Sequence, residues 1–199
     1  MFRNAEARAM GRASLKGNWL MAILVFVVVG IISAVISLIP DATISSIVSF
    51  VILSPITFGI YAYYLQLIRG QQPKLETIFS GFQKFGTTLL LNLLMTIFVL
   101  LWTLLLIIPG IIASFRYAMA WYILHDNPEI RAIDAIRQSK AMMQGYKGQL
   151  FLLYLSFIGW FILCILSFGI GFLWLLPYIQ SSSSAFYENL KAQSTSQVN

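Results

Sequence analysis

Long apolar runs without a charged residue constrain this chain more than any other feature of its sequence. The first extends from Trp19 to Ile39, and runs of similar length cover Ser46–Ile68 and Thr87–Ile108. About 20 such residues in an α-helix cross the hydrocarbon core of a bilayer, which is about 30 Å thick. Each run is therefore predicted to be a membrane-spanning helix.

The composition argues against a soluble fold. Hydrophobic residues make up 59% of the 199 residues and charged residues only 10%, whereas soluble domains contain about 45–50% and about 25%. A soluble domain of this length has too small an interior to hide so much apolar surface, so much of that surface is expected to face lipid. We predict an all-α membrane protein in which residues 1–199 form a single polytopic membrane domain.

The first apolar run resembles a secretion signal, because basic residues precede it. The apolar part of a signal has about 7–15 residues, and the run from Trp19 to Ile39 is longer. No small-residue cleavage motif follows it. We interpret this run as a first span that is retained.

The second half of the chain permits two span counts. Pro109-Gly110 and Gly169-Ile170-Gly171 interrupt apolar segments, and they could lie within long helices or in turns between paired helices. Four spans divide the 13 Lys and Arg residues into 8 and 5 on the two sides, whereas six spans place 12 on one side. Lys and Arg in short loops stay in the cytoplasm. We therefore predict six spans in three hairpins, with both termini cytoplasmic and Pro109, Gly110, Gly169 and Gly171 in hairpin turns.

The predicted spans cover residues 19–39, 46–68, 87–108, 111–125, 149–168 and 172–187. Short amphipathic helices are predicted at the cytoplasmic interface over residues 2–16, 73–85 and 128–146, and residues 189–199 form a polar tail. In the second of these helices, Leu75, Ile78 and Phe82 share one face. Asn127 and Pro128 are predicted to begin the third. The alternative is that these segments are polar-faced loops packed on the bundle.

The sequence contains no pattern typical of a catalytic or metal-binding site. The single histidine, His125, and all seven acidic residues are predicted to lie in loops or at span ends, whereas a membrane enzyme or proton-coupled transporter needs such groups at depth. His125, Asp126 and Glu129 could be drawn as a metal site, but the start of a solvated helix explains them better. Cys164 has no neighbouring base and is interpreted as an apolar packing residue. We expect no catalytic site, no metal and no cofactor.

Arg116 is the one basic residue within a predicted span. Three interpretations stay open. The side chain extends to lipid headgroups, or it faces the bundle and binds an anion, or it donates to the carbonyl of Leu173, which Pro177 leaves without its helical partner. A charge at the centre of the bilayer costs at least about 2.5 kcal/mol. In each interpretation the guanidinium of Arg116 therefore has a polar partner.

The sixth predicted span is too polar to face lipid on all sides, because Gln180 is followed by Ser181, Ser182, Ser183 and Ser184. Serines let helices approach closely and hydrogen-bond to one another, so helix packing is one interpretation. The lining of a polar path is the other. Arg116, Pro177, Gln180, Ser181 and Ser184 are therefore the candidate residues for an anion, a lipid or a helix contact.

Three stretches carry a resemblance to a known family: "LWTLLLIIPGIIASFRYAMAWYIL", "AIRQSKAMMQGYKGQLFLLYLSFIGWFIL" and "GIGFLWLLPYIQSSSSAFYENL". The chain resembles an uncharacterised domain-of-unknown-function family of multipass integral membrane proteins from Gram-positive bacteria. That resemblance implies a membrane protein and brings no established activity. The chain is more distantly similar to the membrane domain of glycerophosphodiester phosphodiesterases, but their soluble catalytic domain has no counterpart here, so their activity is not carried over.

These features together predict a multi-pass protein of the bacterial cytoplasmic membrane. The expected function is that of a non-enzymatic accessory or organising factor that interacts with lipids or proteins. Expected partners are anionic headgroups on the cytoplasmic face and either another membrane protein or a second copy of the chain, and no nucleic acid is expected. The alternative is a permease or channel for a small or amphipathic anion.

Overall fold

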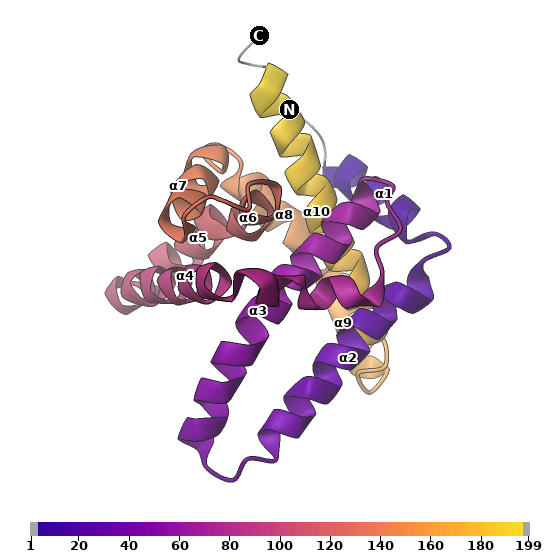
Figure 1. Ribbon diagram of the computed structural model, residues 1–199. Coiled ribbons are helices and arrows are strands. Elements are labelled where there is room, and N and C mark those ends of the chain that lie inside the picture. The colour runs from indigo at the N-terminus through magenta and orange to yellow at the C-terminus, as the bar shows by residue number, and fades with distance from the viewer. Residues whose placement is uncertain (1–3, 197–199) are drawn as a thin grey trace.

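The computed structural model describes residues 4–196, and every element assigned in that range is a helix (Figure 1). In chain order the elements are α1 (Asn4–Leu15), α2 (Trp19–Ser37), α3 (Ala42–Ile68), the 3-10 helix η1 (Leu75–Lys84), α4 (Phe85–Leu105), α5 (Ile107–Tyr117), α6 (Ala120–Asp126), α7 (Ala132–Met142), α8 (Lys147–Leu155), α9 (Ile158–Leu166) and α10 (Phe172–Ser196).

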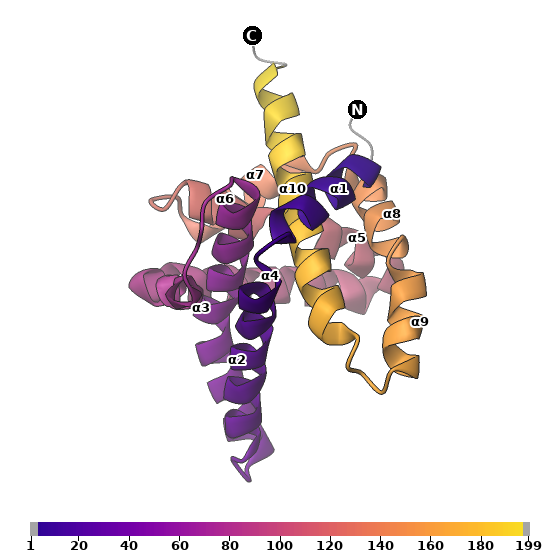
Figure 2. The ribbon, with the colours of Figure 1, turned by 90° about the vertical axis from the view of Figure 1, so that its right-hand side faces the viewer.

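The packed body of the protein forms around α10, which rises through the middle of the molecule (Figures 1 and 2). Helix α10 contacts α1, α2, α3, α7 and α9. Buried side chains concentrate in the second half of α3, in α6 and in the middle of α10. The core is therefore largely made by three helix segments that are distant in the sequence.

Three hairpins project from this body: α2–α3, α4–α5 and α9–α10. Their ends expose large apolar side chains, with Leu104 82% and Phe168 98% accessible. Such contiguous apolar surface is expected where a protein faces lipid. The α2–α3 and α9–α10 ends point in the same direction, whereas α4 lies crosswise to α2–α3 in both views (Figures 1 and 2).

Within the described residues, five segments are long and apolar enough to cross a membrane: Trp19–Ser37, Ala42–Ile68, Leu75–Leu105, Ile107–Asp126 and Lys147–Leu166. Each overlaps one of the first five predicted spans. The sixth predicted span falls in α10, which is not among the candidates found within residues 4–196. The physical reason is the run of polar residues from Gln180 to Ser184, which interrupts the apolar part of that helix.

The predicted turn at Pro109 and Gly110 lies three residues earlier, at Leu106. Helix α4 ends at Leu105, Leu106 is extended with φ −162° and ψ 142°, and α5 begins directly after it. Pro109 is tolerated in the first turn of α5, because backbone N–H groups there have no helical partner. A Cβ on Gly110 would lie 2.1 Å from Oγ1 of Thr103, so the glycine allows α4 and α5 to approach closely.

The second predicted turn, at Gly169-Ile170-Gly171, is present at that position in the structure. Residues 167–171 connect α9 to α10, and Gly169 adopts a φ of +87°. Its N–H donates to the carbonyl of Cys164 over 2.9 Å, which closes the end of α9. Such a left-handed glycine is a common helix terminator.

Two predicted spans are interrupted helices. Residues 111–125 include a break between α5 and α6, and residues 149–168 include one between α8 and α9. The segments predicted as interfacial helices correspond to α1, η1 and α7. Helix α7 begins at Ala132, four residues later than expected, because residues 127–131 form a turn in which the N–H of Ile130 donates to the carbonyl of Asn127.

Glycines let η1 cross α3 with their backbones in contact. A Cβ on Gly59 of α3 would lie 1.9 Å from the carbonyl oxygen of Ile78, and one on Gly81 of η1 would lie 2.1 Å from that of Pro55. No larger residue fits at either position without moving a backbone. Helix α4 follows η1 directly, so this crossing also fixes the position at which α4 begins relative to α3.

Replacing Gly81 with alanine should therefore lower the free energy of unfolding by about 1–3 kcal/mol, the usual cost of overpacking. The matched control is Gly86→Ala at the start of α4, where an added Cβ meets no atom of another element. That control should be neutral or slightly stabilising. Reversible unfolding in mixed detergent micelles measures both, and equal stabilities of the two variants would contradict the close crossing.

Candidate functional site

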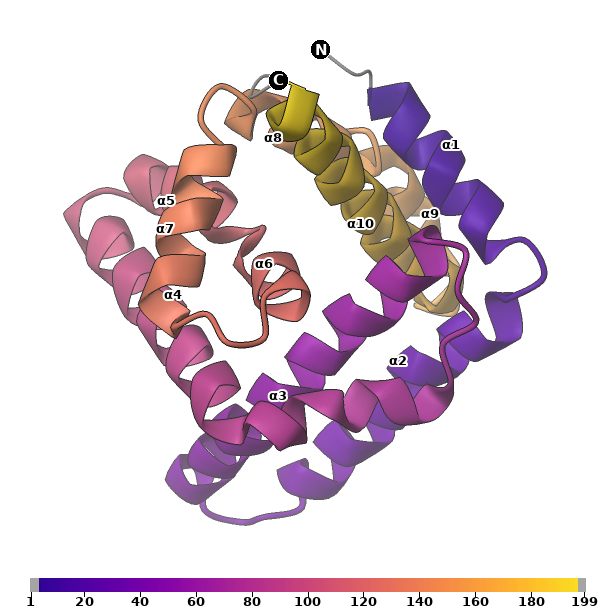
Figure 3. The ribbon, with the colours of Figure 1, turned by 45° about the horizontal axis from the view of Figure 1, so that its top comes forward.

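Arg116 lies in the last turn of α5, away from the hairpin end. Its guanidinium carbon is 5.8 Å from the centroid of the Trp102 ring on α4, within the range of a cation–π contact. Helix α7 lies over the α4–α5 pair and contacts both (Figure 3). Arg116 is half-buried among α4, α5 and α7.

The break between α5 and α6 is closed by one side chain from α7. The hydroxyl of Ser139 donates to the carbonyl of Arg116 over 2.8 Å and accepts from the N–H of Met119 over 3.2 Å. Both backbone groups would otherwise lack a partner, which is costly in an apolar environment. Ser139 is fully buried, so water does not substitute for it.

A cavity of about 370 Å³ opens beside Arg116. We call it the basic cavity; its lining residues are Arg116, Arg137, Lys140, Ala141, Gln144 and Lys147. None of these residues is acidic. One carboxylate contacts a lining residue: that of Asp134 lies 3.2 Å from the guanidinium of Arg137. Asp134 also lies 2.7 Å from the guanidinium of Arg131, which is not part of the lining.

Arg116 and Pro177 are not brought together. Helix α5 packs against α4, α7 and α8, and within residues 4–196 Arg116 shares no hydrogen bond with α10. The hypothesis that Arg116 donates to the carbonyl of Leu173 therefore has no support in the geometry. The chain turns away between the two residues because α6, not α5, continues toward α10.

The polar residues of α10 contact the helices around it. Ser181 donates to the carbonyl of Gly11 over 3.0 Å, and its hydroxyl is 2.7 Å from that of Ser14, both on α1. Ser184 and Gln180 reach the hydroxyl of Tyr122 on α6 over 3.2 and 3.4 Å. Four consecutive serines point around a helix in steps of about 100°, so different serines meet different helices.

Gly11 makes the contact between α1 and α10 possible. A Cβ at Gly11 would lie 2.8 Å from the backbone nitrogen of Ser182. The two backbones therefore lie close together, although less closely than those of α3 and η1. Small residues at such crossings are typical of helices packed within membranes.

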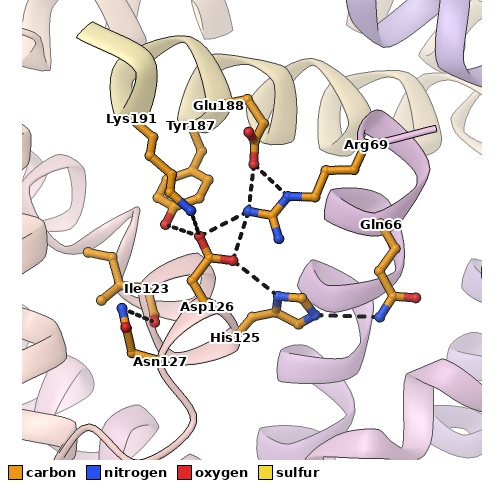
Figure 4. Close-up of polar contacts among 9 residues, drawn as sticks. All are labelled: Gln66, Arg69, Ile123, His125, Asp126, Asn127, Tyr187, Glu188 and Lys191. Atoms are coloured by element: carbon orange, nitrogen blue, oxygen red, sulfur yellow. Dashed lines mark hydrogen bonds and ion pairs between the residues drawn. The ribbon is translucent and has the colours of Figure 1, made fainter. Parts of the chain in front are cut away.

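The sequence predicts that His125 and Asp126 lie at the start of a solvated helix, but the structure encloses the Asp126 side chain, which is 8% exposed. Figure 4 shows the carboxylate surrounded by groups from α3 and α10. It is 2.8 Å from the guanidinium of Arg69, accepts from the hydroxyl of Tyr187 over 2.9 Å, and pairs with Lys191.

Arg69 extends this network to a second carboxylate. Its guanidinium is 2.7 Å from Glu188 of α10. Burial opposes the charge of Arg69, but hydrogen bonds to Asp126 and Glu188 outweigh that effect and raise the pKa of the guanidinium. The network ties together the ends of α3, α6 and α10. The network could have been predicted from one pattern in the sequence: Arg69, Asp126 and Glu188 all lie at predicted span ends on the same side of the membrane.

His125 borders the Asp126 network. His125 Nδ1 lies 3.5 Å from Asp126, and His125 Nε2 lies 3.5 Å from the amide nitrogen of Gln66. Over the described part of the chain, no three His, Cys, Asp or Glu residues gather as a metal ion would require. The network is a structural joint between helices.

Replacing Ser139 with alanine should lower the free energy of unfolding by about 1–3 kcal/mol, because buried backbone groups of Arg116 and Met119 lose their partner. Ser37→Ala is the control, since Ser37 is exposed and bonds only within its own helix; it should change stability by less than about 0.5 kcal/mol. Unfolding in mixed micelles measures the difference, and a Ser139→Ala effect as small as the control would refute the bridging role.

Replacing Asp126 with asparagine should lower the free energy of unfolding by about 1.5–3 kcal/mol, because charge-assisted hydrogen bonds to Arg69 and Lys191 are lost in a largely enclosed position. Asp134→Asn is its matched control, because that carboxylate also contacts two cations but both are mostly exposed. Exposed pairs contribute about 0–1 kcal/mol. Thermal unfolding of the two variants compares them; equal losses would mean that the Asp126 network is no stronger than a surface pair.

The sequence profile of one family matches residues 1–113 and 103–194. Comparison with curated proteins gave no match, and neither did comparison with solved structures. Because the two matched segments together cover more than half of the chain, this protein belongs to the family described as "Protein of unknown function (DUF975)".

Proposed function

We propose that this protein is a non-enzymatic, lipid-interacting factor that organises the bilayer or other proteins within a bacterial cytoplasmic membrane. One observation carries the proposal: basic side chains gather around α7 and the neighbouring end of α8, while the hairpin ends expose leucine, isoleucine and phenylalanine. A cationic region beside apolar arms suits contact with anionic headgroups and acyl chains at once.

The arrangement of the ends supports a cytoplasmic position for both termini. Helix α1 and the C-terminal end of α10 lie at the same end of the molecule (Figure 2). The charged network of Asp126 joins helix ends at that level, and Lys and Arg are retained on the cytoplasmic side during insertion. The resemblance to proteins of Gram-positive bacteria supports a bacterial membrane. A membrane-protein partner or a second copy of the chain stays a prediction.

The alternative is a permease or channel for an anion. In that case Arg116 and the serines of α10 would line a common path. Ser181 and Ser184 instead are fully buried against α1 and α6, and Arg116 lies among α4, α5 and α7. This separation favours the lipid-interacting function.

Two measurements on the purified protein distinguish these functions. Lipids retained through mild detergent extraction should be several-fold richer in anionic phospholipid than the source membrane. Vesicles that contain the protein and an entrapped anion such as chloride should lose that anion no faster than empty vesicles. Protein-dependent efflux without lipid enrichment would overturn the proposal and favour the permease.

A further inference from the structure

The basic cavity adjoins a second hollow of different character. This apolar groove has a volume of about 320 Å³, and its apolar lining residues are Phe98, Trp102, Tyr117, Ile133 and Ile136. Arg137 and Lys140 line both spaces. Trp102 also touches Arg116 through its ring face. The two spaces therefore adjoin, and we call the pair the depression, which is cationic at one end and apolar at the other.

The cationic end has an excess of positive charge. Four cations line the basic cavity, and Asp134 offsets part of the charge of Arg137 alone. Over residues 4–196, Lys140 and Lys147 have no ion-pair partner. Like charges held this closely repel one another, and an anion between them removes the repulsion. The guanidinium of Arg116 and the ammonium groups are the donors that phosphate oxygens accept from most strongly.

The apolar end suits an acyl chain. Phe98 and Tyr117 lie with ring centroids 6.0 Å apart, and isoleucines of α7 form the opposite side. Beyond the groove, Leu100 and Leu101 of α4 are 62% and 54% exposed. This surface faces lipid if α4 lies in the membrane, so a chain lying in the groove continues into the bilayer without crossing a polar surface.

We infer that the depression between α4, α5 and α7 binds one anionic glycerophospholipid. Its phosphate lies in the basic cavity between Arg116, Lys140 and Lys147, and one acyl chain lies along Trp102 and Ile136. The excess positive charge disfavours headgroups that carry a cation of their own, such as the quaternary ammonium of phosphatidylcholine. This inference rests on the proposed lipid-interacting function and names one site for it.

Lys140→Gln is the sharpest test. Lys140 is exposed and makes no ion pair or hydrogen bond within the described chain, so folding does not need its charge. Arg131→Gln is the control, because Arg131 carries the same charge on the N-terminal side of α7, is 79% exposed and lies outside the basic cavity. Arg116→Gln adds a variant inside the cavity, and circular dichroism verifies its helix content.

The measurement is native mass spectrometry of protein released from nanodiscs of phosphatidylcholine containing a minor fraction of phosphatidylglycerol. The wild-type protein and Arg131→Gln should retain one phosphatidylglycerol. Lys140→Gln should bind it about tenfold more weakly, as expected for one lost charge-assisted contact. Arg116→Gln should weaken binding at least as much.

The outcomes separate this site from the general function. Equal retention by Lys140→Gln and wild type would overturn the site, even if the protein still enriches anionic lipid. Equal weakening by Lys140→Gln and Arg131→Gln would also overturn it, because binding would then follow net charge alone. Inorganic phosphate that displaces the lipid at equal concentration would overturn the role of the apolar groove. No enrichment of anionic lipid by the wild-type protein would reject the proposed function itself.

Discussion

Side-chain hydroxyl groups connect the helices of this protein where the hydrophobic effect does little. Between helices in lipid, apolar contacts are exchanged for equally apolar contacts with acyl chains, so association depends on close packing and hydrogen bonds. Ser139 closes the break between α5 and α6, Ser181 joins α10 to α1, and Ser184 joins it to α6. Gly11 and Gly81 let backbones touch at two crossings. These few small residues hold α10 against α1 and α6, α7 against the α5–α6 break, and η1 against α3.

The membrane-spanning character of the chain could be predicted because an uncharged apolar run of about 20 residues has few other physical explanations. Residues 19–39 and 46–68 correspond closely to α2 and α3. The helix breaks could not be predicted in the same way. The one after α5 depends on Ser139, which lies 20 residues farther along the chain from Met119. Pro109 and Gly110 predict a turn because proline and glycine are usually found in turns, but the first turn of a helix also tolerates proline.

The candidate residues were only partly predictable for a related reason. Arg116 was conspicuous as a charge within an apolar segment, and its surroundings follow from how α7 folds back over α4 and α5. The interpretation with Leu173 assumes that the whole fourth span lies beside the sixth, but only its α6 part reaches α10, and Arg116 lies in α5. The serines of α10 were open to two interpretations, because hydrophobicity alone does not show which helices surround them. The role of Asp126 is not evident from its sequence neighbours, because its partners Arg69, Tyr187 and Lys191 come from two other segments of the chain.

The shortness of α5 has a mechanical consequence. Its 11 residues are about 17 Å long, little more than half of the hydrocarbon thickness. Its partner α4 lies crosswise to α2–α3 (Figure 1), and Leu104 and Ile108 at the hairpin end are 82% and 71% exposed. If α2–α3 stands along the bilayer normal, the α4–α5 hairpin displaces lipid at one depth only.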